Sequence, residues 1–150
     1  APFYRVYETS DGEYMSVGAI EPQFFKLVLA MLDVDFDPAR QHDRSTWVSL
    51  GEVFRERFLS NTRAHWSALF DGTDACVAPI LSVADALEHE HMGARGSILP
   101  TPSGGVQPGL APRFSNHPHA APGQVAARGA DTERVLKAHT RITAQELAEG

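Results

Sequence analysis

Glycine and proline are concentrated in one stretch of the C-terminal half, and this feature constrains the fold more than any other. Between residues 93 and 129 lie six of the ten prolines and seven of the twelve glycines. Both residues interrupt helices and strands, so a segment this rich in them is not expected to form a packed core. We therefore predict a small α+β domain over residues 1–92, an extended, turn-rich segment over 93–129, and a helical tail over 130–150.

Length and composition exclude several classes of protein. The chain has 150 residues, of which 43% are apolar, and a net charge of −6, which suits one globular domain. No apolar run reaches the roughly 18–20 residues that cross a bilayer, no basic stripe is present for nucleic acid, and the single cysteine excludes an internal disulfide. We expect a soluble, cytoplasmic protein without nucleic-acid or membrane partners. Because the sequence starts at Ala1 in the middle of a strand pattern, we also expect the natural protein to continue upstream.

The first thirty residues predict a hairpin followed by a helix. Residues 3–7 are aromatic and β-branched, residues 11–12 form an Asp-Gly turn pair, and residues 14–20 alternate. Pro22 suits the first helical position because the hydrogen bond it lacks would be missing there in any case. The apolar spacing predicts that this helix buries Phe24, Leu27, Val28, Met31 and Leu32.

A polar loop over residues 33–44 precedes two more predicted helices. Ser45 or Thr46 is expected to cap the first of them, and Thr62 the second, with Gly72 as its left-handed stop. Their inward residues are expected to be Trp47, Leu50, Phe54 and Phe58 in the first helix, and Trp66, Leu69 and Phe70 in the second.

Residues 75–81 predict a short buried strand, and Pro79 within it favours a sheet edge or a bulge. Ser82 and Asp85 resemble a capping box for a short helix that ends near residue 89. Asp131 or Thr132 is expected to cap a helix through residue 136, and a second capping box is expected over residues 143–146. The predicted fold class is α+β: a small antiparallel sheet with three or four helices, then the extended segment and short C-terminal helices.

Two residue types invite a catalytic or metal-binding interpretation that the sequence supports poorly. The pairs at residues 89 and 91 and at 117 and 119 place histidines close together, but no third or fourth ligand follows at a metal-site spacing. Exposed loop histidines are the better interpretation, and no metal is expected. Cys76 lies in an apolar run and is expected to be a small buried core residue, since a nucleophile would need a nearby base.

Glu21 is the most informative carboxylate. It ends a strand and opens a helix, after the small residues 18–19, so it should project from the rim of the sheet. Simple attraction to the positive end of the helix dipole explains an acid at this position. A single carboxylate without a partner is not a catalytic pair, and from the residues alone the dipole explanation is favoured.

Four ordered segments resemble the α-methylacyl-CoA racemases of the class III (CaiB/BaiF-type) CoA-transferase family. They are residues 17–25 (VGAIEPQFF), 74–81 (DACVAPIL), 91–96 (HMGARG) and 111–115 (APRFS). The resemblance implies a large CoA-binding domain upstream, followed by this small domain and by a tail that returns to the large one. It also implies a homodimer of interlocked subunits, with each active site between one subunit's large domain and the other's small domain.

The resemblance further implies an isomerase that epimerises 2-methylacyl-CoA thioesters through an enolate. The proton carriers of such racemases are a His and an Asp of the large domain, so this chain alone is expected to be inactive. Coenzyme A is part of the acyl-CoA substrate, and no separate cofactor is implied. Glu21 matches a family glutamate that supports the catalytic His across the dimer interface, whereas Cys76 matches a family cysteine and keeps its structural interpretation.

Two other functions stay open at this point. A class III CoA-transferase would move CoA between carboxylic acids through an Asp of the large domain, and the deciding loop would precede Ala1. A non-catalytic dimerisation or interaction module is also compatible with the length. The acyl-chain preference would depend mostly on residues outside this chain.

Overall fold

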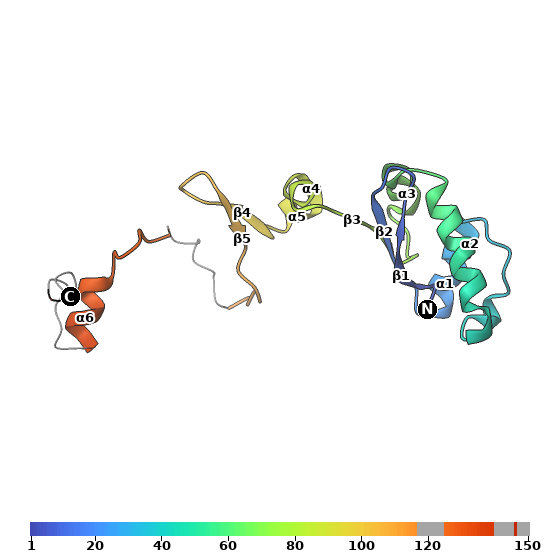
Figure 1. The fold of residues 1–150 in the computed structure, drawn as a ribbon, viewed down its shortest axis with the longest axis horizontal. Coiled ribbons are helices and arrows are strands. Elements are labelled where there is room, and N and C mark those ends of the chain that lie inside the picture. Colours follow the sequence, from blue (N-terminus) through green and yellow to red (C-terminus); the bar gives the residue numbers. More distant parts are fainter. Residues whose placement is uncertain (117–124, 140–145, 147–150) are drawn as a thin grey trace. The chain divides into compact units, whose positions relative to one another are not determined.

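The computed structural model describes residues 1–116, 125–139 and 146. It divides the chain into two compact units, Ala1–Ala86 and Leu87–Gly150, which are coloured blue to green and yellow-green to red in Figure 1. Both units combine helices with a small antiparallel sheet, which confirms the predicted α+β class. The predicted boundaries at residues 92 and 129 stay predictions.

A three-stranded antiparallel sheet organises the N-terminal unit. Its strands, in spatial order, are β1 (Tyr4–Glu8), β2 (Tyr14–Gly18) and β3 (Val77–Ile80). The predicted β1–β2 hairpin is confirmed, and Gly12 in its turn has a φ of 75° that favours glycine. Strand β3 lies at the sheet edge, which confirms the position predicted from Pro79.

Helices follow β2 in the order predicted. Thr62 caps α3 as predicted, because its hydroxyl accepts a hydrogen bond from the His65 N–H. The start of α2 differs from the prediction: a short 3-10 turn comes first, and the carboxylate of Asp43 caps that turn. The bounds are α1 (Pro22–Met31), η1 (Pro38–Arg40), η2 (Arg44–Thr46), α2 (Trp47–Leu59) and α3 (Arg63–Phe70).

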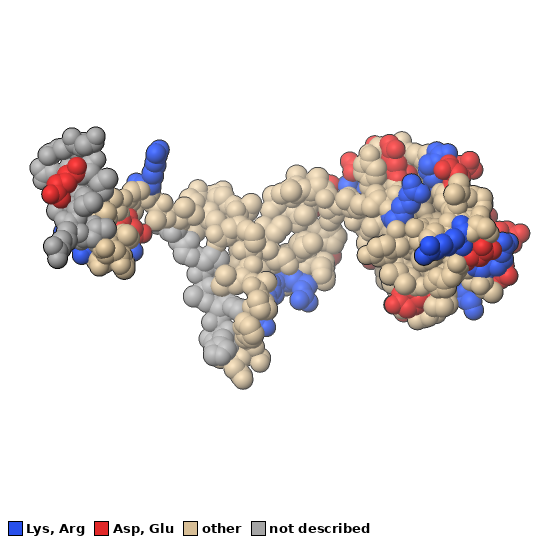
Figure 2. Space-filling model, turned by 60° about the horizontal axis from the view of Figure 1, so that its bottom comes forward, with Lys and Arg blue, Asp and Glu red and all other residues tan. Residues whose placement is uncertain are grey.

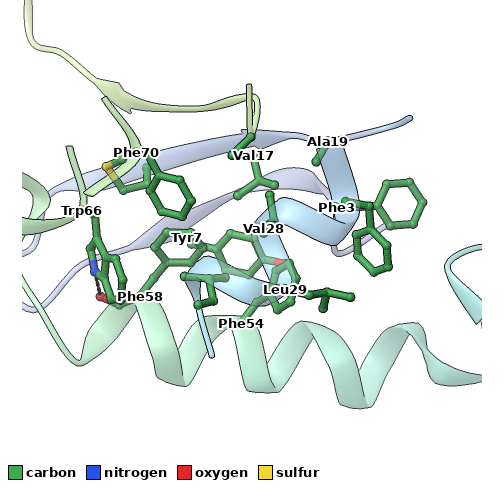
Figure 3. Close-up of a cluster of buried hydrophobic side chains, with 14 of the residues drawn as sticks. Phe3, Tyr7, Val17, Ala19, Val28, Leu29, Phe54, Phe58, Trp66 and Phe70 are labelled. Atoms are coloured by element: carbon green, nitrogen blue, oxygen red, sulfur yellow. Dashed lines mark hydrogen bonds between the residues drawn. The ribbon is translucent and has the colours of Figure 1, made fainter. Parts of the chain in front are cut away.

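An aromatic core joins one face of the sheet to these helices (Figure 3). Phe58 of α2 stacks on Tyr7 of β1 at 5.1 Å between ring centroids and meets Trp66 of α3 edge-on at 5.4 Å. The indole N–H of Trp66 donates to the Phe58 carbonyl, drawn as a dashed line in Figure 3. The fully buried or nearly buried apolar residues are Phe3, Tyr7, Met15, Val17, Ala19, Phe25, Val28, Leu29, Leu32, Leu50, Phe54, Phe58, Trp66, Phe70 and Ala75.

Two predicted inward faces are partly wrong. Helix α1 buries Phe25 and Leu29 beside the predicted Val28 and Leu32, while Leu27 is exposed and Phe24 and Met31 are only partly buried. Apolar residues occur on both sides of this helix, so the sequence period alone did not define which side the sheet covers. In α3, Trp66 and Phe70 are buried one turn apart, and Leu69 is exposed.

The strand predicted over residues 75–81 is shorter and less buried than expected. It begins at Val77, because Cys76 has a φ of 54° and its left-handed backbone cannot continue the strand. Cys76 is exposed, so the prediction of a buried core cysteine is wrong. The neighbouring Ala75 occupies the core position instead.

Arg63 ties the hairpin to β3 and to the helix that follows. Its guanidinium donates to Glu13 at 2.8 Å, to the Ile80 carbonyl at 2.9 Å and to Asp85 at 3.0 Å. The hydrogen bond from Arg63 is the main cause that lowers the pKa of Asp85. The predicted capping box is confirmed, because the Asp85 N–H donates to the Ser82 hydroxyl and the Ser82 N–H to the Asp85 carboxylate.

The C-terminal unit contains a two-stranded hairpin and short helices, and none of its described residues is buried. A Cβ on Gly109 would collide with the Gly96 carbonyl, so only glycine fits this close approach. The turn-rich character predicted for residues 93–129 agrees with the described part, whereas the capping box predicted at Thr143 lies outside it. The elements are α4 (Val83–Glu88), which crosses the division between the units, α5 (Glu90–Ala94), β4 (Ile98–Pro100), β5 (Val106–Pro108) and α6 (Thr132–His139).

Replacement of Phe58 by alanine is expected to destabilise the N-terminal unit by about 3–5 kcal/mol, the usual cost of removing a buried phenylalanine. The side chain is fully buried and contacts three other aromatic rings. Urea unfolding of the chain measures the effect. Val48→Ala on the same helix is the control, because Val48 is 80% exposed, and its effect should stay within about 0.5 kcal/mol. A loss below about 1 kcal/mol for Phe58→Ala would contradict this core.

Candidate functional site

Glu21 lies at the junction between β2 and α1. Strand β2 ends at Gly18, Ala19 turns into the core, and Glu21 has an extended backbone with φ −75° and ψ 141° as the N-cap residue of α1. Pro22 follows at the first helical position, as predicted. The junction is therefore fixed on one side by the sheet and on the other by the helix.

The Glu21 carboxylate is exposed, and its side chain makes no capping hydrogen bond. Within the described residues, this carboxylate accepts no hydrogen bond and forms no ion pair. Helix capping thus does not use it, although the positive end of α1 still favours a negative charge there. The carboxylate remains available to accept a hydrogen bond from a group outside this chain.

The sheet face opposite the core is open and largely apolar. The pairing register places Tyr4, Val6, Tyr14 and Ile80 on this face, with exposed fractions of 66%, 47%, 43% and 38%. We refer to these four residues as the outer sheet face. A shallow depression of about 340 Å³ lies along the strands; it is lined by Tyr4, Arg5, Val6, Ser16, Val17, Gly18 and Cys76.

Cys76 lies at the same end of the sheet as Glu21. Its carbonyl accepts a hydrogen bond from the Gly18 N–H at 2.8 Å, three residues before Glu21. Desolvation raises the pKa of the Cys76 thiol, and the negative charges of Glu21 and Asp74 raise it further. A raised pKa leaves less thiolate at neutral pH, so this environment does not activate Cys76 as a nucleophile.

Gln41 is a buried polar residue at the junction, and no pattern in the sequence pointed to it. It belongs to the loop interpreted only as polar, yet it is 2% exposed, and its amide Nε2 donates to the Ala19 and Ile20 carbonyls. Its Oε1 has no hydrogen-bond partner among the described residues. No motif or spacing marks this residue, because its role depends on contacts with Ala19, Ile20 and Trp47 that only the folded chain brings together.

The histidines in the described part of the chain do not form a metal site. His89 and His91 are exposed at the start of α5, and His65 packs edge-on against Trp66. His117 and His119 lie outside the described residues. Within the described ranges no group of three or more His, Cys, Asp or Glu side chains is arranged to hold a metal ion.

Charged side chains of both signs are interspersed over the face of the N-terminal unit shown at the right of Figure 2. Among the described helices, none combines the length and the apolar character needed to cross a membrane.

The β2–α1 junction offers a narrow chemistry: one free carboxylate, that of Glu21, beside an apolar sheet face. Such a group can orient a hydrogen-bond donor, but it cannot remove and return a proton from two opposite faces of a substrate.

The sequence is similar to proteins of one family over most of its length. The model of CoA-transferase family III matches residues 1–132. The chain is 41% identical over 119 residues to alpha-methylacyl-CoA racemase of Homo sapiens and, equally, to that of Mus musculus; the match covers 79% of this chain and 31% of each relative. It is 32% identical over 105 residues to the CaiB/baiF CoA-transferase family protein ZK892.4 of Caenorhabditis elegans, covering 68% of this chain and 29% of that protein.

A solved structure agrees with the fold. A mutant of Rv3272 from Mycobacterium tuberculosis superposes with a TM-score of 0.64 at 13% identity, covering 86% of this chain and 38% of that one. The chain thus spans about a third of the length of the curated relatives it matches. The resemblance seen in the four sequence segments is confirmed at the level of the family: the chain belongs to CoA-transferase family III.

Proposed function

We propose that this chain supplies the small-domain part of an acyl-CoA racemase, an isomerase that epimerises 2-methylacyl-CoA thioesters. The observation that carries the proposal is the free, exposed carboxylate of Glu21, fixed at the β2–α1 junction. It occurs in a chain that is 41% identical to proteins named alpha-methylacyl-CoA racemase.

The reaction needs two proton carriers on opposite faces of the α-carbon. One removes the α-proton as a base, fixed dipoles stabilise the enolate, and the other delivers a proton to the opposite face. In the proposed enzyme these carriers are a His and an Asp of a large domain that lies outside this chain. Coenzyme A is bound there as part of the substrate thioester, and no separate cofactor takes part.

Glu21 acts on the His rather than on the substrate. Its carboxylate accepts a hydrogen bond from one imidazole N–H, which fixes the tautomer that leaves the other nitrogen free to take the α-proton. The negative charge also favours the imidazolium formed in that step. Glu21 is therefore a positioning residue in this proposal.

The partner that brings the His is proposed to be the large domain of a second subunit, in a homodimer of interlocked chains. Two observations support this assembly. The relatives are about three times as long as the aligned region, and the outer sheet face leaves four large apolar side chains exposed. Soluble monomers seldom keep a contiguous apolar patch open unless a partner covers it.

A class III CoA-transferase is the second candidate function. The family name and the name of the Caenorhabditis elegans relative favour it. Such an enzyme would form an anhydride between an Asp of the large domain and the acyl group, and it would move CoA between two carboxylic acids. Glu21 would then have no imidazole to support.

The two candidates differ in products. The complete natural protein that carries this sequence is incubated in D2O with one epimer of a 2-methylacyl-CoA, with and without a free carboxylic acid. The racemase proposal expects the opposite epimer with deuterium at the α-carbon, independent of the added acid. Formation of a new acyl-CoA from the added acid without epimerisation would establish the transferase instead.

Self-association of the isolated chain is expected as a consequence of the open outer sheet face. Light scattering at rising concentration should show species larger than the monomer. The variant Val6→Lys/Ile80→Lys places charges on that face and should shift the chain toward monomer, whereas Val48→Lys on α2 should not. A clean monomer at high concentration would instead favour an independent, non-catalytic interaction module.

A further inference from the structure

Gln41 grips the backbone immediately before Glu21. Its side-chain amide donates to the Ile20 carbonyl at 2.8 Å and to the Ala19 carbonyl at 3.2 Å. The amide nitrogen thus donates to the carbonyls of two consecutive peptide groups between the end of β2 and the start of α1. These bonds orient the peptide that leads directly into Glu21.

A braced loop holds Gln41 in place. The Gln41 carbonyl accepts the indole N–H of Trp47 at 2.8 Å, and the Trp47 ring lies edge-on to the buried ring of Phe3 at 5.7 Å. Asp37 and Asp43 cap the two short turns that flank Gln41. A continuous series of contacts therefore runs from the aromatic core through Trp47 and Gln41 to the junction.

Burial makes this grip specific for an amide. Gln41 is 2% exposed, so water does not replace its donors readily when they are lost. A carboxylate in the same place would face two carbonyl oxygens, and an apolar chain would leave both without these bonds. Loss of the Gln41 amide should therefore loosen only the backbone of residues 19–21. The sheet and the helix on either side keep their own hydrogen bonds, so the effect stays local.

We propose that Gln41 is a positioning residue for Glu21: through the Ala19 and Ile20 carbonyls it fixes where the Glu21 carboxylate meets the group it supports. The inference rests on the proposed role of Glu21. Displacement of a supporting group by about 1 Å can cost up to about 10²-fold in rate. Gln41 acts on the orientation of Glu21 and has no contact with substrate.

The first test uses the 150-residue chain and does not depend on its activity. Amide hydrogen exchange is compared for the chain and for Gln41→Met, which keeps the length and shape of the side chain. Exchange at the Ile20 and Phe25 amides, which donate to the Gly18 and Glu21 carbonyls, is expected to rise about tenfold, the effect of one ordinary hydrogen bond. Exchange in β1 and α3 should stay unchanged, which shows that the variant folds. Gln41→Asn, which shortens the reach by one methylene, gives the same readout if Gln41→Met does not fold.

The second test uses the complete natural protein and the α-proton exchange reaction. Gln41→Met should lower kcat about tenfold while KM for the acyl-CoA stays the same. The double variant Glu21→Gln/Gln41→Met should be no slower than Glu21→Gln alone, because a positioning residue has nothing left to position. A purely structural role for Gln41 would instead multiply the two losses.

The outcomes separate this inference from the proposed function. Unchanged exchange at the Ile20 and Phe25 amides in Gln41→Met or Gln41→Asn, or multiplicative losses in the double variant, overturn the role of Gln41. If Glu21→Gln alone leaves kcat unchanged, the role of Glu21 fails and the inference fails with it. The hydrogen-exchange result then still records whether Gln41 holds the junction.

Discussion

The isolated 150-residue chain is expected to exchange no α-proton of a 2-methylacyl-CoA in D2O above the uncatalysed background. The junction offers one free carboxylate, and both proton carriers are proposed to lie in a large domain outside this chain. Each positioned acid or base contributes about 10²–10⁴-fold to such a reaction. The absence of both should therefore cost at least about 10⁴-fold.

Mass spectrometry of the recovered thioester measures this exchange, with the complete natural protein at equal molarity as the positive control. Addition of a separately prepared large domain to the chain should restore exchange if the two parts assemble. Exchange by the chain alone, at a rate that grows with its concentration, would place the proton carriers within these 150 residues. The role assigned to Glu21 would then have to be withdrawn.

Glu21→Gln in the complete protein is expected to lower kcat for α-proton exchange by about 10²–10³-fold. The change keeps the size of the side chain and removes its charge, so the imidazole loses the partner that fixes its tautomer; an analogous loss in a serine protease triad costs about 10⁴-fold. KM for the acyl-CoA should change little, because Glu21 does not touch the substrate in this proposal.

Glu56→Gln is the matched control for this variant. It makes the same chemical change at an exposed glutamate of α2, and its kcat should equal that of the unmodified protein. Urea unfolding of both variants checks that stability is preserved. A kcat for Glu21→Gln within about twofold of the control would show that the junction carboxylate is a helix-start feature only.

Local signals in the sequence predicted much of the fold correctly. The Asp-Gly turn, the Thr62 cap and the capping box of Ser82 and Asp85 were predicted as the structure has them. Each of these features depends on residues only a few positions apart in the chain, so a short stretch of sequence is enough to predict it. The position of Pro79 at an edge also followed from a local property, its missing donor.

The errors concern features that distant parts of the chain decide. Helix α1 has apolar residues on two sides, and the sheet above it selects the side with Phe25 and Leu29. Cys76 was expected in the core because of its apolar neighbours, but its left-handed backbone turns it outward. Neither outcome can be obtained from period or composition alone.

The candidate site was predictable only in part. Glu21 was found because its position between a strand and a helix is visible in the sequence, and because the segment around it resembles a family motif. Gln41 was missed because its structural role depends on hydrogen bonds to carbonyls about twenty residues away in the sequence. A glutamine in a polar loop carries no sign of burial, and only the three-dimensional contact reveals its use.

The pH dependence of α-proton removal tests most directly whether Glu21 works through an imidazole. In the complete protein, kcat/KM is measured for the epimer whose proton the imidazole removes, so activity rises with pH as that imidazole loses its own proton. The Glu21 carboxylate favours the imidazolium and raises its pKa, so Glu21→Gln should move this acidic limb to lower pH by about one unit. An acidic limb with the same midpoint in the two proteins, whatever the difference in their maximal rates, would contradict the account.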